Sequence, residues 1–124
     1  MRIRRISSGG IFEDRVGYCR AVVAGGFVHV AGTTAPGPDV PGDVVAQCAA
    51  ALGVIETALK RAGAGFGDVV RVTYMLPDRN DFEPCWPLLA ATFGENPPAA
   101  TMMTCGLIDP ELKIEIEVTA LLPG

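Results

Sequence analysis

One amphipathic segment constrains the fold of this 124-residue chain more than any other. Between Asp43 and Ala62 the apolar residues recur at alternating spacings of three and four, which keeps them on one face of an α-helix. They are Val45, Cys48, Leu52, Ile55 and Leu59. Asp43 is a typical N-cap, and Gly63 follows where glycines commonly end helices. We therefore expect one long helix whose apolar stripe packs on a sheet.

Runs rich in β-branched and aromatic residues lie on both sides of this helix and predict strands. The Gly25-Gly26 pair between the first two runs predicts a hairpin. The predicted strands are 17–23, 27–32, 68–76, 100–106 and 113–121. A second, weaker helix is expected over 81–93, although Pro87 strains it. This order predicts an α+β fold over a single domain, 1–124, in which a mixed sheet carries two helices on one face.

The composition indicates a covered apolar surface and excludes several classes of protein. Hydrophobic residues make up 49% of the chain and charged residues only 19%, below the usual ~25%. We therefore expect another subunit to cover part of the apolar surface. With a net charge of −4, the chain lacks the overall positive field on which non-specific nucleic-acid binding depends. No apolar run suits a membrane helix or a signal peptide, so we expect a cytoplasmic protein without membrane contact.

The cysteines and the single histidine give no metal-binding pattern. Cys19, Cys48, Cys85 and Cys105 form no Cys-x-x-Cys pair, which favours reduced thiols packed as small hydrophobes. His29 lies between valines and has no cysteine near it in the sequence, so an imidazole satisfied inside the sheet is favoured over a catalytic base. We expect neither a metal nor an organic cofactor.

Five stretches of the chain match one known pattern in the same order. They are Tyr18–Val22, Val28–Thr33, the long helix that opens near Gln47, Asp68–Phe82, and Phe93–Glu117 with its Ile-Glu-Ile-Glu end. Together they resemble the reactive intermediate deaminase family, called Rid or YjgF and, in older names, endoribonuclease L-PSP or translation initiation inhibitor. The resemblance covers nearly the whole chain.

The resemblance implies a chorismate-mutase-like α+β fold, assembled as a homotrimer around a central barrel with ligand clefts between subunits. It also implies cofactor-independent hydrolysis of amino-acid-derived imines and enamines to 2-keto acids and ammonia. Such chemistry needs a cation for the substrate carboxylate and a carboxylate beside the attacking water. By resemblance Glu115 is the catalytic carboxylate. The residues expected to line the cleft are Tyr18, Arg20, Thr33, Ala100, Thr101 and Met103.

The chain departs from the family pattern at one important position. The arginine of the family's Pro-Ala-Arg-Ser falls at Ala100, and an alanine cannot pair with a substrate carboxylate. Arg20 stands where better-known members carry glutamine, two residues after Tyr18 on the same strand face. Arg20 is either a relocated anchor for a carboxylate ligand or a partner in an intersubunit ion pair.

Three functions remain open from the sequence. The first is a small-molecule hydrolase of imines, enamines or related carbonyl compounds. The second is a trimer that binds a small ligand without catalysis. The third, which follows from the older family names, is an endoribonuclease or translation inhibitor, and the acidic net charge disfavours it.

Overall fold

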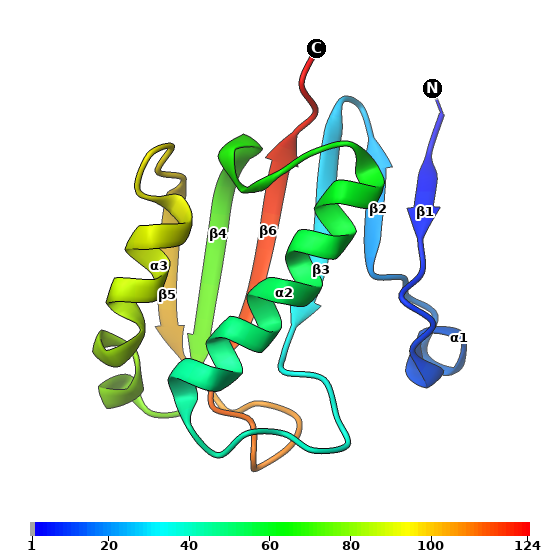
Figure 1. Ribbon diagram of the computed structural model, residues 1–124. Coiled ribbons are helices and arrows are strands. Elements are labelled where there is room, and N and C mark those ends of the chain that lie inside the picture. The colour runs from blue at the N-terminus through cyan, green and yellow to red at the C-terminus, as the bar shows by residue number, and fades with distance from the viewer. Residues whose placement is uncertain (1) are drawn as a thin grey trace.

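The computed structural model describes residues 2–124, in which six strands form one sheet of order β1-β2-β3-β6-β4-β5. The strands are β1 Arg4–Ile6, β2 Ala21–Ala24, β3 Phe27–Thr33, β4 Val69–Leu76, β5 Ala99–Thr104 and β6 Glu115–Leu121. The α-helices are α1 Ile11–Val16, α2 Val44–Ala62 and α3 Trp86–Phe93. The 3-10 turns are η1 Phe66–Asp68, η2 Arg79–Asp81 and η3 Glu83–Cys85. Helices α2 and α3 cover one face of the sheet, as the sequence predicted (Figure 1).

The strand directions decide which residues meet at each edge of the sheet. The β2–β3 hairpin turns at Gly25-Gly26, where both residues have positive φ, and β6 lies antiparallel between β3 and β4. Strand β5 runs parallel to β4, after a crossover through α3. As a result the C-terminal ends of β3, β4 and β5 lie beside the N-terminal ends of β2 and β6. This end of the strands is the lower one in Figure 1.

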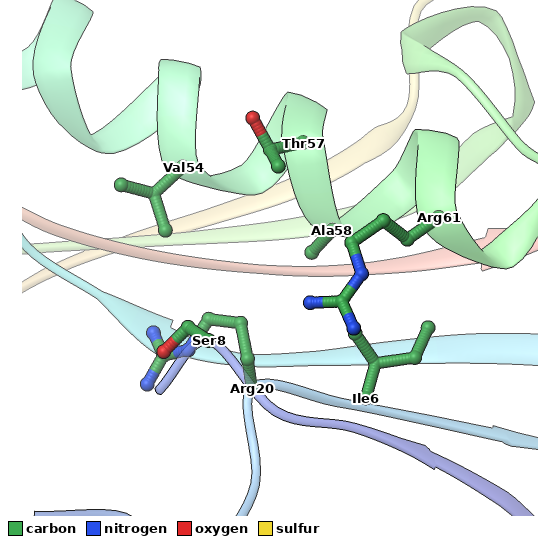
Figure 2. Close-up of a pocket in the computed structure, with 7 residues that line it drawn as sticks. All are labelled: Ile6, Ser8, Arg20, Val54, Thr57, Ala58 and Arg61. Atoms are coloured by element: carbon green, nitrogen blue, oxygen red, sulfur yellow. The ribbon is translucent and has the colours of Figure 1, made fainter. Parts of the chain in front are cut away.

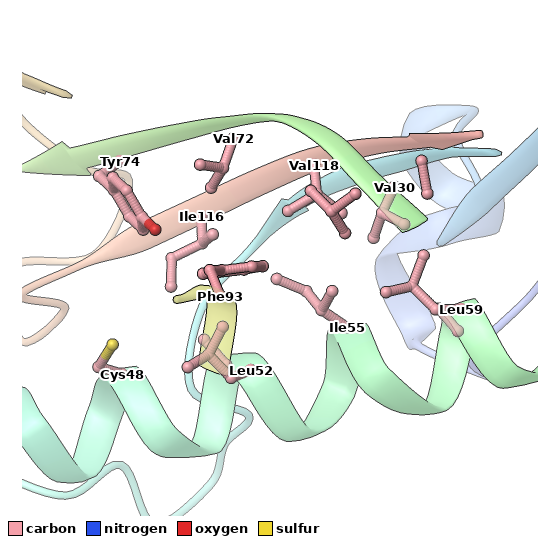
Figure 3. Close-up of a cluster of buried hydrophobic side chains, with 14 of the residues drawn as sticks. Val30, Cys48, Leu52, Ile55, Leu59, Val72, Tyr74, Phe93, Ile116 and Val118 are labelled. Carbon is pink, nitrogen blue, oxygen red and sulfur yellow. The ribbon is translucent and has the colours of Figure 1, made fainter. Parts of the chain in front are cut away.

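The stripe of α2 forms the core together with the inner face of the sheet. The Asp43 carboxylate accepts a hydrogen bond from Ala46 N at 3.0 Å, and Gly63 ends the helix with φ of 92°. Ile55, Leu59 and Ile116 have no exposed surface and pack between helix and sheet (Figure 3). Each side chain of this size contributes about 1.5–3 kcal/mol when it is removed from water.

Two of the four cysteines belong to this core. Cys48 and Cys85 are fully buried, and all four thiols are free. Burial raises the pKa of the Cys48 thiol to about 12, so it stays protonated at neutral pH. Both residues therefore pack as small hydrophobes.

Three details differ from the predicted elements. Strand β1 and helix α1 were not predicted, because each is too short to show a periodic pattern. The predicted helix over 81–93 is instead a succession of η2, η3 and α3, with Pro84 in η3 and Pro87 in the first turn of α3. Each proline is tolerated there because a first-turn N–H needs no helical partner.

None of the helices in the described part of the chain is long and apolar enough to cross a membrane.

A buried glutamine fixes the loop that leads into β6. Gln47 is completely buried near the start of α2. Its amide nitrogen donates to the Pro41 and Glu111 carbonyls at 2.7 and 3.0 Å, and its oxygen accepts from Lys113 N at 2.8 Å. Gln47 thus holds the backbone two residues before Glu115.

Replacement of Gln47 by leucine should lower the free energy of unfolding by about 3 kcal/mol, because three backbone groups in a partly buried network lose their partners. Urea denaturation measures the loss. Thr57→Val on the exposed side of the same helix is the control, with an expected change within about 0.5 kcal/mol. Equal effects of the two substitutions would contradict the structural role of Gln47.

Candidate functional site

Four of the residues that the sequence singled out meet at one edge of the sheet. Tyr18 and Arg20 lie just before β2, Thr33 is the last residue of β3, and Glu115 is the first residue of β6. Since β3 lies between β2 and β6, the three segments are neighbours. The strand order thus brings a phenol, a guanidinium, a hydroxyl and a carboxylate to the same end of the sheet. The guanidinium lies under α2, whereas Glu115 belongs to the face without helices.

The Arg20 side chain is held by contacts within its own chain. Its Nη1 donates to the Gly32 carbonyl at 3.2 Å and to the Thr33 hydroxyl at 2.9 Å. Thr33 is buried, and its hydroxyl in turn donates to the Ala31 carbonyl at 2.7 Å. The Arg20 guanidinium carbon lies 5.6 Å from the centre of the Tyr18 ring, a cation–π distance. Arg20 and Tyr18 therefore form one unit.

Arg20 forms no ion pair with a carboxylate of residues 2–124. Within residues 2–124 the one ion pair joins Lys60 to Glu56, and Arg20 Nε is buried without a hydrogen-bond partner. Arg20 also lines a hollow of about 240 Å³ under α2, together with Ser8 and Arg61 (Figure 2). The guanidinium therefore has donor capacity that the fold does not use.

Glu115 has the electrostatic character of a proton acceptor. Its side chain is partly buried, and desolvation, followed by the negative charge of Glu117, raises its pKa above the ordinary value, while Arg20 acts in the opposite direction. A raised pKa makes a carboxylate a better base when water attacks a substrate.

Gly32 makes room for this carboxylate, a role that the sequence reasoning missed. A β-carbon at Gly32 would overlap the Glu115 carboxylate. Gly32 lies between Val30 and Thr33, where the pairing of β3 with β6 changes register. The available signal was a glycine inside a β-branched run, which marks a bulge or a close approach.

The predicted residues of β5 divide between the two faces of the sheet. Met75 of β4 pairs with both Glu115 and Met103, so these two side chains share a row and a face, two strands or about 10 Å apart. Thr101 lies on the same face one row away, and its hydroxyl accepts from Arg71 at 3.3 Å.

Ala100 lies on the opposite, helix-covered face of the sheet. It pairs with Val72, a core residue, and lines a hollow together with side chains of α3. Within one chain Ala100 is therefore separated from Glu115 by the sheet. Ala100 can join a cleft with Glu115 only from a neighbouring copy.

The expectation for His29 was wrong. His29 pairs with Val22 and Thr119, and its side chain is exposed on the face without helices. Its ring centre lies 6.3 Å from that of Phe27. Alternation along β3 decides this, because the neighbouring valines point into the core and turn the histidine outward.

In the described part of the chain, no cluster of three potential ligand side chains could hold a metal ion.

Fold and site together define an α+β protein with a polar site at one edge of a mixed sheet. The chain belongs to the Endoribonuclease L-PSP family, whose model matches residues 12–122. This is the Rid or YjgF family, so the resemblance seen in the sequence is confirmed.

Relatives and solved structures agree with this membership. A RutC family protein of Pyrococcus abyssi is 34% identical over 107 residues, which cover 83% of this chain and 84% of the relative. A 2-iminobutanoate/2-iminopropanoate deaminase of Capra hircus is 32% identical, with 96% and 90% covered. A crystal structure of a YjgF/YER057c/UK114 family member from Mycobacterium tuberculosis superposes with a TM-score of 0.90 at 40% identity, covering 98% of this chain and 100% of that one.

The raised pKa of Glu115 predicts a pH-dependent effect on stability. An acid whose pKa is higher in the folded than in the unfolded chain destabilises the fold as pH rises above its unfolded-state value, here 4.5. Glu115→Gln removes this cost. The variant should therefore gain unfolding free energy over the wild type at about pH 7, and the gain should vanish near pH 4. Urea denaturation at both pH values measures it, and an equal gain at both would contradict the raised pKa.

Proposed function

We propose that the protein forms trimers whose intersubunit clefts bind and hydrolyse a small imine, enamine or related carbonyl compound. Glu115 is the observation that carries the proposal. It is a partly buried carboxylate with a raised pKa, fitted against Gly32 and within electrostatic reach of Arg20. The deaminase names of the relatives from Capra hircus and Escherichia coli support the same class of reaction.

The proposed chemistry needs only water and groups of this site. Glu115 accepts a proton from water as its oxygen bonds to the imine carbon, and the C=N bond becomes a C–N single bond. Glu115 then returns that proton to nitrogen, which gives a carbinolamine. The hydroxyl proton of this intermediate passes through Glu115 to nitrogen, the C–N bond breaks, ammonia leaves, and the C–O bond becomes a carbonyl. A positioned general base contributes typically 10²–10⁴-fold to such a step.

Arg20 is the proposed binding group for a ligand carboxylate. It is held next to Tyr18 and Thr33, and its remaining donors suit a planar anion. This role replaces the family's arginine, for which the chain has Ala100. The other possibility for Arg20, an ion pair with a neighbouring subunit, uses the same free donors.

The exposed apolar surface of the chain supports assembly. Every residue of β5 is exposed, and β5 is an edge strand with one unpaired side. Large apolar side chains on the helix-free face are also exposed, among them Phe27 at 38%, Leu121 at 49% and Met103 at 46%. Surfaces of this kind commonly mark protein interfaces.

A trimer that only binds its ligand is the second candidate, because the same exposed surface supports it without catalysis.

Glu115→Gln should reduce the rate of ammonia release from 2-aminoacrylate, generated in a coupled assay, by at least about 100-fold, because the general base is lost. Glu117→Gln is the matched control, since it lies on the same strand and face. It should keep the turnover and move the acidic limb of the pH profile to lower pH, because Glu117 raises the pKa of Glu115.

Two results would contradict the proposal. Wild-type protein that does not accelerate ammonia release from imines or enamines leaves only the binding trimer. A mass equal to one 13.0 kDa chain by light scattering at micromolar concentration excludes a cleft between subunits.

Arg20→Ala should weaken the binding of pyruvate, a carboxylate product analogue, by about tenfold or more, because a charge-assisted pair is lost. Isothermal titration calorimetry measures the affinity. Arg15→Ala, which removes an exposed charge from α1, is the control. Unchanged affinity in Arg20→Ala, together with a smaller mass by light scattering, would assign Arg20 to an intersubunit ion pair.

A further inference from the structure

Two arginines line one hollow under α2, and they reach it from opposite sides (Figure 2). Arg61 comes from the last turn of α2, and Arg20 from the segment before β2. Ile6, Val54 and Ala58 supply apolar surface, and the volume is about 240 Å³. Sites for drug-sized ligands usually measure ~300–1,000 Å³, so this hollow suits a smaller ligand.

Both guanidiniums keep donors that the described chain does not use. Arg20 bonds to Gly32 and Thr33 through Nη1, and its Nε is buried without a partner. Among residues 2–124 the Arg61 side chain makes one hydrogen bond, from Nη1 to the Ser7 carbonyl. Each guanidinium therefore has capacity for a charge-assisted bond to an oxyanion.

The surroundings of the hollow are positive, although the chain has a net charge of −4. No acidic side chain lines it, and Arg4 lies just beyond it, where its Nη2 donates to the Arg61 carbonyl at 3.0 Å. One carboxylate, Glu13, adjoins the hollow, and it accepts from Ser8 N at 3.1 Å and from Gly10 N at 3.2 Å. The three arginines outnumber this bonded carboxylate, and a local positive region attracts an anion.

Arg61 also has a structural role, which accounts for only part of this arrangement. A cation in the last turn complements the dipole of α2, and the bond to Ser7 ties the helix to the segment after β1. Neither contact explains a second guanidinium, that of Arg20, in the same hollow. Like charges in one small space repel each other, and an anion between them removes this cost.

We propose that this hollow binds a phosphate group, of inorganic phosphate or of a small phosphate monoester, with Arg20 on one side and Arg61 on the other. A carboxylate pairs with one guanidinium, whereas a phosphate has oxygens for two and carries nearly two negative charges. The ligand lies on the helix side of the sheet, and Glu115 belongs to the other face. The proposal therefore does not rest on the proposed hydrolysis.

Inorganic phosphate should bind the wild type in a saturable way by isothermal titration calorimetry. It should also raise the unfolding temperature more than chloride does at equal ionic strength, because a ligand of the folded state stabilises it. Acetate, a monocarboxylate, should bind at least about tenfold more weakly. Glycerol 3-phosphate distinguishes the two sources of the phosphate group, since tighter binding than phosphate assigns an ester and weaker binding assigns free phosphate.

Substitution of Arg61 tests the site directly. Arg61→Gln should weaken phosphate about tenfold or more, because a charge-assisted pair is lost. Lys60→Gln removes the same charge from the neighbouring residue, which is exposed and pairs with Glu56, and should leave the affinity unchanged. Arg61→Lys keeps the charge without the planar fork, so its affinity should fall between the two. Thermal unfolding without phosphate verifies that each variant is folded, and Arg61→Lys carries the test if Arg61→Gln is not.

Pyruvate separates this site from the proposed function. Arg61→Gln should leave the affinity for pyruvate unchanged, whereas Arg20→Ala should weaken phosphate as well as pyruvate. If Arg20→Ala weakens phosphate alone, the hollow is supported and the role of Arg20 in the proposed function is wrong.

Three outcomes would overturn the proposal. The first is phosphate that shows no saturable binding and stabilises the protein no more than chloride does. The second is an equal affinity for phosphate in Arg61→Gln and Lys60→Gln, which would limit Arg61 to its contacts within the fold. The third is an affinity for phosphate that Arg20→Ala does not change.

Discussion

The pairing of β6 between β3 and β4 is the constraint on which the rest of the structure depends. It joins the β1–β2–β3 half of the sheet to the β4–β5 half, and each of its two neighbours runs antiparallel to it. Alternation along β6 then does two things at once. Ile116, Val118 and Ala120 point to α2 and are buried, while Glu115 and Glu117 point to the face without helices.

The polar site follows from where β6 begins. Gln47 holds the loop before it, and the register change in β3 brings Gly32 against Glu115. A carboxylate in this position is partly desolvated and lies near both a like charge and a cation, which is how proteins shift the pKa of a functional acid. The same edge also collects the ends of β4 and β5, so that Met75 and Met103 continue the row that Glu115 begins.

The residues of interest are distributed over the two faces of the sheet. The helix-free face carries Glu115 and Thr101, and the helix face carries Ala100 above an apolar groove. A sequence pattern that places Ala100 and Glu115 in one cleft is compatible with this geometry only if two copies contribute. Family membership and the proposed trimer are consistent with that arrangement.

The sequence by itself determined the long helix, its caps, the hairpin and the α+β class, because these depend on local periodicity and on glycine and aspartate at fixed positions. It also predicted Tyr18 and Arg20 on one strand, which was wrong, because β2 begins only at Ala21; the two side chains lie together in the segment before it. Tertiary structure alone decided the parallel β4–β5 pair, the fit of Gly32 to Glu115 and the separation of Ala100 from that carboxylate. Each of these depends on register between strands far apart in the chain, and a shift of one residue would reverse the face of every side chain.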